Sequence, residues 1–129
     1  MEPIDRIRAF FSNDQFAMLT GVEIDEVKAG YSKCSLTIHP KHLNSDGVAM
    51  GGALFTLADI AFAAAANVEV NAVTMSSQIT FLRPSKGPKL TAEARRVHQG
   101  RSTCFYHVDI TDGTGTIVAV AMFSGFVKG

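Results

Sequence analysis

A single carboxylate interrupts the most apolar stretch of the chain. Asp59 is the only charged residue between positions 47 and 68. Because an unpaired buried charge is costly, such an acid ordinarily faces water, caps a helix or pairs with a base. In a cleft with a few polar neighbours, the same carboxylate can instead act as a general base or as a nucleophile. Asp59 is therefore a candidate catalytic residue, and the sequence leaves both chemical roles and the structural alternative open.

Gly52 precedes this acid at the expected start of a helix. The first backbone N–H groups of a helix have no partner within it, and the helix dipole favours negative charge at that end. A glycine also lets a substrate carbonyl come close. The Gly52 N–H is therefore a candidate donor to the negative oxygen that develops during acyl transfer. The alternative is a tight join between loop and helix that tolerates no side chain.

The spacing between Gly52 and Asp59 limits what one chain can do. Seven residues at ~100° each return to nearly the same helix face, but they advance ~10 Å along the axis. The Asp59 side chain leans back toward the helix start, which recovers roughly a third of that distance. One reacting carbon cannot contact both groups, so the geometry predicts that they come from different subunits. Two antiparallel copies of the helix at a dimer interface would bring Gly52 of one chain to Asp59 of the other.

The elements that position these residues follow from hydrophobic periodicity. Residues 51–67 are apolar on nearly all sides and contain no proline, which predicts a broadly buried helix. A shorter amphipathic helix is predicted over residues 3–11 and ends at residues 12–14. Period-two alternation predicts two strands before the long helix and four after it, and hairpin-linked strands indicate an antiparallel sheet. The fold class is therefore α+β, with the long helix lying across the sheet. The predicted strands lie at 22–25, 34–39, 73–81, 90–95, 104–110 and 116–127.

Composition is typical of a single-domain globular protein. The chain has 129 residues, of which 47% are hydrophobic, and a formal net charge of zero. Zero net charge argues against broad binding of nucleic acid or anionic membranes, and the apolar run is interpreted as a core helix and not as a membrane span. Cys34 and Cys104 fit neither a disulfide framework nor a zinc pattern, which predicts reduced thiols in a cytoplasmic protein. His39 and His42 lack an evident third ligand, so no metal site is expected.

Several short motifs follow one another in a fixed order. They are Leu43-Asn44, Gly51-Gly52, Phe55, Leu57-Ala58-Asp59, Ala61-Phe62-Ala63, Phe81-Leu82-Arg83-Pro84 and His98-Gln99-Gly100-Arg101. This order resembles the PaaI-type acyl-CoA thioesterases over nearly the whole chain. The resemblance implies one hotdog domain over residues 1–129, in which a sheet of five to six strands wraps a central helix behind a short N-terminal helix. It also implies cytoplasmic hydrolysis of a phenylacetyl-type or medium-chain acyl-CoA to free acid and CoA.

The resemblance extends to assembly, and it gives Asn44 and Met50 particular interest. In the family, the minimal active unit is a homodimer, and a homotetramer forms as a dimer of dimers. Asn44 matches an asparagine that orients the nucleophilic water or the carboxylate, although an Asx turn in the loop is an equal alternative. Met50 occupies the position where the family usually carries histidine, and methionine can neither move a proton nor usefully hydrogen-bond a thioester oxygen. This departure leaves a non-catalytic acyl-CoA-binding module as the alternative function.

The coenzyme A part of such a substrate calls for cations and a lined channel. Arg83 and Arg101 are the candidate phosphate partners, with solvated surface charges as the alternative. Ser76 and Ser77 could line the acyl or pantetheine channel, or belong to the polar face of the sheet. No cofactor is expected, because coenzyme A is part of the substrate, and no nucleic-acid or membrane partner is expected. The remaining candidate binding residues are Met50, Gly51, Phe55 and Gly100.

Overall fold

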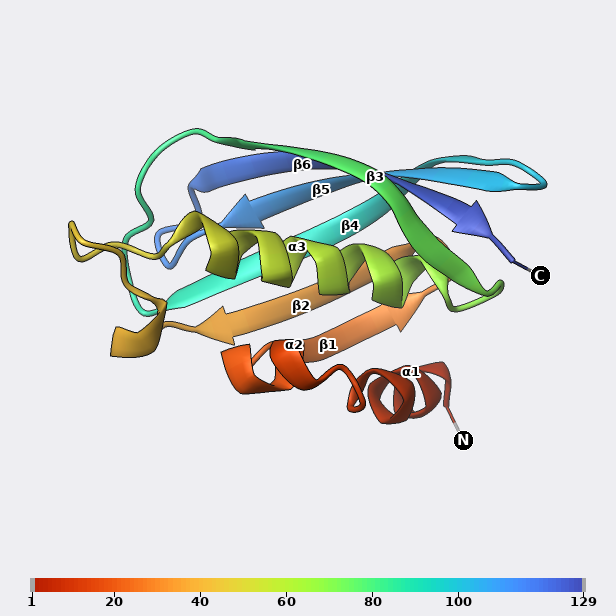
Figure 1. Cartoon of the computed structure of the whole chain (residues 1–129), viewed down its shortest axis with the longest axis horizontal. Helices are drawn as coiled ribbons and strands as arrows, with labels where there is room; N and C mark the ends of the chain where they lie inside the picture. Colours follow the sequence, from red (N-terminus) through yellow and green to blue (C-terminus); the bar gives the residue numbers. More distant parts are fainter. Residues whose placement is uncertain (1, 129) are drawn as a thin grey trace.

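The computed structural model describes residues 2–128. One long helix lies along a curved sheet, and two short helices pack below it (Figure 1). The helices are α1 (Pro3–Phe11), α2 (Gln15–Thr20) and α3 (Gly51–Ala66), with a 3-10 turn at Pro40–His42. The strands are β1 (Glu23–Lys28), β2 (Tyr31–Thr37), β3 (Ala72–Phe81), β4 (Lys89–Gln99), β5 (Thr103–Thr111) and β6 (Ile117–Val127).

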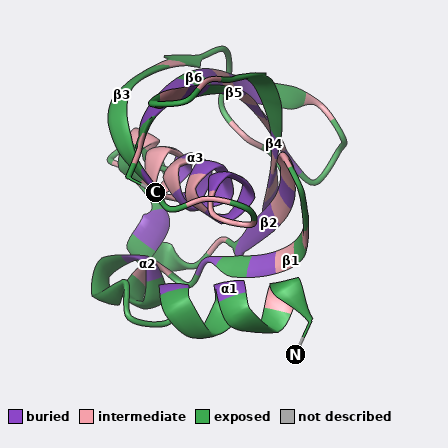
Figure 2. Ribbon diagram, turned by 90° about the vertical axis from the view of Figure 1, so that its right-hand side faces the viewer, coloured by how far each residue is buried: buried purple, intermediate pink, exposed green. Residues whose placement is uncertain are grey.

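All six strands form one antiparallel sheet in the order β1-β2-β4-β5-β6-β3. The end-on view shows this sheet curving around α3, whose more exposed side is turned toward β3 (Figure 2). The sheet and the central helix confirm the predicted α+β class and hotdog architecture. No helix within residues 2–128 is long and apolar enough to cross a membrane.

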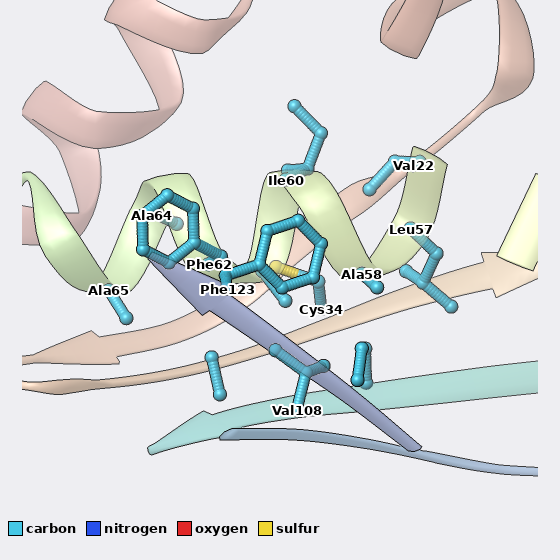
Figure 3. Close-up of a cluster of buried hydrophobic side chains, with 14 of the residues drawn as sticks. Val22, Cys34, Leu57, Ala58, Ile60, Phe62, Ala64, Ala65, Val108 and Phe123 are labelled. Atoms are coloured by element: carbon cyan, nitrogen blue, oxygen red, sulfur yellow. The ribbon is translucent and has the colours of Figure 1, made fainter. Parts of the chain in front are cut away.

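The core lies between α3 and the concave face of the sheet. Leu57, Ala58 and Phe62 point from α3 toward the strands, whereas Ile60 points away from them (Figure 3). The Phe62 ring stacks on Phe123 of β6, with centroids 5.2 Å apart and planes 11° apart. This side of α3 is fully buried, and Ile60 is buried as well. The part of the helix available for other contacts is the side that carries the partly exposed residues Phe55, Asp59 and Ala63.

The short helix α2 was not predicted from the sequence. The predicted end of the first helix at residues 12–14 is correct, but the chain immediately forms a second helix of six residues. So short a segment carries too few apolar repeats to stand out in a periodicity search. Gly21 ends α2 in the left-handed conformation at φ +98°. The helix begins at the α1–α2 turn and packs beside α3.

A β-bulge in β3 changes which residues face α3. The register shifts between Thr74 and Ser76, so Met75 is an extra residue in the strand. Strict alternation predicts that Val73 shares a face with Ser77, and this prediction is wrong. Val73 pairs with the exposed Phe126. Thr74 pairs with Gly125 and Ser77 with Phe123, and both of these β6 positions face the core. The bulge thereby turns Thr74 toward the long helix.

Candidate active site

Asp59 lies midway along α3, on the side that the sheet does not cover. It is half-buried, and its Oδ1 accepts a hydrogen bond from the Thr74 hydroxyl at 3.1 Å. Burial raises the pKa of the Asp59 carboxyl, the Thr74 hydrogen bond opposes that shift, and the negative charge of Asp14 adds to it. Within residues 2–128, no basic side chain comes within salt-bridge distance of Asp59. The carboxylate is therefore neither a helix cap nor half of an ion pair.

Gly52 lies on the same side of α3, at its N-terminus. Within residues 2–128, its backbone N–H has no hydrogen-bond acceptor. A Cβ placed on Gly52 would meet no atom within 4 Å, whereas a Cβ on Gly51 would lie 3.0 Å from the Phe81 ring. The tight-join alternative therefore accounts for Gly51 and not for Gly52. Among residues 2–128, no neighbouring atom therefore requires a glycine at position 52.

Met50 caps this helix without a capping side chain. Serine, threonine, asparagine or aspartate at this position would ordinarily bond the first free N–H groups. The thioether makes no such bond: within residues 2–128 the N–H groups of Gly51 and Gly52 have no acceptor, whereas the Ala53 N–H donates to the Met50 carbonyl at 2.9 Å. Met50 is 54% exposed. The Met50 N–H donates to the His42 carbonyl at 2.8 Å, which fixes the chain as it enters α3. The start of α3 is thus anchored through the Met50 N–H, while the Gly52 N–H remains available to a group from outside the chain.

Three hollows surround the open side of α3. The Asp59 hollow, of about 530 Å³, lies between α3 and the start of α2; the Gly52 hollow, of about 390 Å³, adjoins it. Phe16, Phe55 and Thr56 line both. The Arg83 hollow, of about 580 Å³, lies across the start of α3 and is lined by Asn44, Gly51 and Arg83, among others. The Phe55 ring also packs on the core ring of Phe123, with centroids 5.8 Å apart.

Asn44 forms the Asx turn that was its structural alternative. Its Oδ1 accepts hydrogen bonds from the backbone N–H groups of Asp46 at 2.9 Å and Val48 at 3.2 Å. Within residues 2–128, its amide nitrogen has no acceptor. Asn44 lines the Arg83 hollow and not the Asp59 hollow. In one chain it therefore accompanies the helix N-terminus and not the carboxylate.

The two candidate phosphate-binding arginines lie at opposite ends of the sheet. Arg83 follows β3 and donates to the Ile117 carbonyl at 2.6 Å, at the end where α3 begins. Arg101 lies in the β4–β5 turn, next to Ser102, whose carbonyl accepts from the Val127 N–H at 2.8 Å. That turn is closed by the Gly100 N–H, which donates to the Thr103 carbonyl at 2.7 Å. One chain therefore cannot place both arginines on one coenzyme A.

The two serines of β3 are separated by the pleat of the strand. The Ser76 hydroxyl lies 2.5 Å from the Ser124 hydroxyl, on the outer face of the sheet. Ser77 is opposite Phe123, on the face that α3 covers. Both serines line a shallow hollow of about 260 Å³ that spans β3, β6 and β5. Neither lines the hollows that contain Asp59 and Gly52.

Three residues near the carboxylate were missed by the sequence reasoning. Strict alternation groups Thr74 with Ser76 and Gln78 and gives it no role, because the bulge at Met75 has no clear sequence signal. Asp14 and Phe16 line the Asp59 hollow from the α1–α2 turn and from α2. The helix-terminating residues at 12–14 were recognised, but only an α2 prediction would have brought them to α3.

Comparisons with known proteins give one consistent result. The family model described as the thioesterase superfamily matches residues 46–119. Acyl-coenzyme A thioesterase PaaI of Escherichia coli K12 is 37% identical over 114 residues, which cover 87% of this chain and 81% of that protein. A putative esterase of Archaeoglobus fulgidus is 33% identical over 121 residues, covering 92% of this chain and 79% of that one.

Solved structures agree with this result. The E. coli PaaI structure superposes with a TM-score of 0.92 at 32% identity and covers 98% of this chain and 94% of that one. A hypothetical thioesterase from Streptococcus pneumoniae, solved with coenzyme A, gives a TM-score of 0.83 at 33% identity, with 92% and 97% coverage. A Streptococcus mutans protein bound to acetyl-CoA gives 0.79 at 32% identity, with 84% and 90% coverage.

Proposed function

Because this chain belongs to the thioesterase superfamily and is a PaaI-like acyl-CoA thioesterase, we propose that it hydrolyses aromatic or medium-chain acyl-CoA at a site shared by two subunits. The carbon–sulfur bond of the thioester breaks, one water is consumed, and a carboxylic acid and CoA are released. Asp59 supplies the base or the nucleophile, and the Gly52 N–H of the partner chain holds the developing oxyanion. The relatives solved with coenzyme A or acetyl-CoA support this substrate class.

Asp59 is suited to remove a proton from water. Burial raises its pKa, so its ionised form is a stronger base than a fully solvated carboxylate. The Thr74 hydroxyl limits that rise and holds one carboxylate oxygen, while the other remains available to water. As a nucleophile, the same carboxylate would expel the CoA thiolate, which solvent protonates, and would form a mixed anhydride that one water then hydrolyses to the free acid and the regenerated Asp59. When Asp59 acts as a base, the proton that it takes from the attacking water passes to the departing thiolate.

One observation carries the proposal that the site is shared. Gly52 and Asp59 lie on the same open side of α3, seven residues or ~10 Å apart along the axis. Gly52 has a free N–H and an empty space where its side chain would be, so a group from outside the chain can approach it. An antiparallel second α3 would bring the partner's Gly52 within reach of a thioester that Asp59 attacks.

The edge of the sheet supports such a dimer. β3 is an edge strand of ten residues, and most of its side chains are exposed. Long uncovered edges of this kind favour pairing with another strand. Antiparallel pairing of two β3 strands across a two-fold axis would extend the sheet and place the two α3 helices antiparallel. The same axis would bring Arg101 of one chain toward the Arg83 end of the other. The further homotetramer, a dimer of dimers, is proposed from the family resemblance.

The remaining binding residues fit the coenzyme A arm of the substrate. The Arg83 hollow adjoins the start of α3 and offers a guanidinium group, which suits a phosphate. Asn44 lies in the same hollow with a free amide nitrogen that can orient the attacking water. Met50 removes any role for a side-chain imidazole here, so oxyanion stabilisation falls to the backbone N–H groups.

Subunit mixing tests the shared site. An Asp59→Asn chain and a Gly52→Val chain are each expected to be nearly inactive alone. When the two are unfolded together and refolded, half of the dimers are mixed, and each mixed dimer has one intact site. Activity should return to about a quarter of wild type, measured as thiol release from phenylacetyl-CoA and hexanoyl-CoA. No recovery, with mixed dimers demonstrated by mass spectrometry, would assign both groups to one chain.

A further inference from the structure

α2 presents two large apolar side chains to solvent. Phe16 is 73% exposed and Leu19 is 72% exposed, and they lie almost one helical turn apart. Phe16 lines both the Asp59 hollow and the Gly52 hollow, whereas Leu19 lines neither. The two residues lie on the same helix and are almost equally exposed, but only Phe16 lines the hollows of the candidate site. Leu19 is therefore a matched control for any role of Phe16.

The end of α2 is fixed to the segment that leads into α3. The Lys41 ammonium group donates to the Leu19 carbonyl at 2.6 Å. The His42 Nε2 lies 2.6 Å from the Thr20 carbonyl, and its Nδ1 accepts from the His39 N–H at 2.9 Å. Because Nδ1 accepts a backbone N–H, the ring donates to the Thr20 carbonyl from Nε2. These contacts anchor the end of α2, the helix that carries Phe16, to the segment that enters α3.

The two hollows that adjoin the start of α3 differ in chemistry. The Gly52 hollow is walled by apolar side chains of Phe16, Met50, Ala53 and Phe55, and its lysine is already bonded to a carbonyl. The Arg83 hollow instead offers a guanidinium group and an amide. Both hollows adjoin the start of α3, where the thioester carbonyl would be held. From that carbonyl an acyl-CoA extends in two directions, as the acyl hydrocarbon on one side and as the phosphate-bearing coenzyme A arm on the other. The hydrocarbon arm suits the apolar hollow, and the phosphate-bearing arm suits the hollow with arginine.

We propose, on the basis of the thioesterase function above, that the Gly52 hollow is the acyl subsite and that Phe16 is its specificity-determining residue. The Phe16 ring covers the hydrocarbon part of an aromatic or medium-chain acyl group, which gives this exposed side chain an apolar partner. Acyl groups that end in a carboxylate are disfavoured. Asp14 and Asp59 line the adjoining hollow and repel a carboxylate, whereas the lysine that lines the subsite, Lys41, is held at the Leu19 carbonyl.

Kinetics with three substrates test the role of Phe16. Phe16→Ala and Leu19→Ala are compared with wild type on phenylacetyl-CoA, hexanoyl-CoA and acetyl-CoA. Phe16→Ala should lower kcat/KM roughly tenfold for the first two and much less for acetyl-CoA, because only the longer acyl groups reach the ring. Leu19→Ala should leave all three unchanged. Equal losses on all three substrates, or the same effect from Leu19→Ala, would overturn the proposal.

A binding measurement separates this proposal from catalysis. S-hexyl-CoA is a thioether that cannot be hydrolysed, and its affinity relative to free CoA reports the contribution of the hydrocarbon arm. Wild type and Leu19→Ala should bind S-hexyl-CoA more tightly than CoA in calorimetry, and Phe16→Ala should lose most of that difference. If the protein shows no turnover but prefers S-hexyl-CoA to CoA through Phe16, the hydrolytic function is refuted and the acyl subsite is supported. If the protein hydrolyses acyl-CoA but Phe16→Ala keeps the preference for S-hexyl-CoA over CoA, only the acyl subsite is refuted.

Discussion

The Thr74 hydroxyl donates a hydrogen bond to Asp59 Oδ1, with 3.1 Å between the two oxygens. This contact joins the edge strand of the sheet to the open side of α3, and it exists because the bulge at Met75 turns Thr74 inward. The candidate base is thereby oriented by the strand that we propose for the dimer contact. Assembly and orientation of the carboxylate would then depend on the same segment.

Asp59 should be required for turnover and not for folding. Asp59→Asn keeps the size of the side chain and removes its basicity, so kcat should fall at least ~100-fold in a thiol-release assay. Circular dichroism and the oligomeric state should match wild type. Rates near wild type would exclude Asp59 as base or nucleophile.

The same substitution should stabilise the protein at neutral pH. Burial raises the pKa of Asp59, so the folded protein holds this proton more tightly than the unfolded chain does. Folding stability is then higher below the unfolded value of 3.8 and declines as pH rises through the higher folded pKa. Asp59→Asn removes that decline, so its Tm should exceed that of wild type at neutral pH and approach it as the pH falls toward 4. A Tm difference that stays constant with pH would contradict this account.

Removal of the Thr74 hydroxyl should move the acid limb of the pH profile. The hydrogen bond opposes the rise in the Asp59 pKa, so Thr74→Val should shift the loss of kcat/KM to higher pH. It should also lower kcat roughly tenfold, because a hydrogen bond to a charged group is lost. Thr74→Ser should retain the wild-type profile. Thr80→Val makes the same chemical change on the outer face of β3 and should have no effect; a shift there would mean that strand packing, and not the hydroxyl, sets the profile.

Gly52 and Gly51 should respond differently to alanine. Gly52→Ala meets no atom within 4 Å and improves helix propensity, so the free energy of unfolding should rise by about 0.5–1 kcal/mol. Its methyl group would nevertheless obstruct an approaching carbonyl, and kcat/KM should fall roughly 10- to 100-fold. Gly51→Ala must displace the Phe81 ring and should therefore stabilise less. Denaturant melts and kinetics of both variants check this, and full activity in Gly52→Ala would remove Gly52 from the reaction.

Hydrophobic pattern was sufficient to predict most of the fold. The limits of α3 differ from the prediction by one residue, because sixteen residues with an apolar surface on nearly every side have few other stable arrangements. The six strands follow alternation and turn residues that act locally. Motif order then predicted the family, which the comparisons bear out.

The site was less predictable because it depends on contacts between distant segments. Thr74 faces α3 only because of one extra residue in β3, and a bulge of this kind leaves no mark in alternation. Asp14 and Phe16 reach the site through α2, which is too short for a periodic signal. Arg83 and Arg101 were paired by chemistry alone, and strand register separates them within one chain.

The separation of Gly52 and Asp59 along one helix has a consequence for how the enzyme responds to dilution. Because neither chain would react alone, the specific activity should depend on protein concentration. It should fall when the protein is diluted below the dissociation constant of the proposed dimer, and it should recover when substrate that bridges both chains draws them together. Protein concentration would then determine both the number of chains present and the fraction of them that belong to an active dimer.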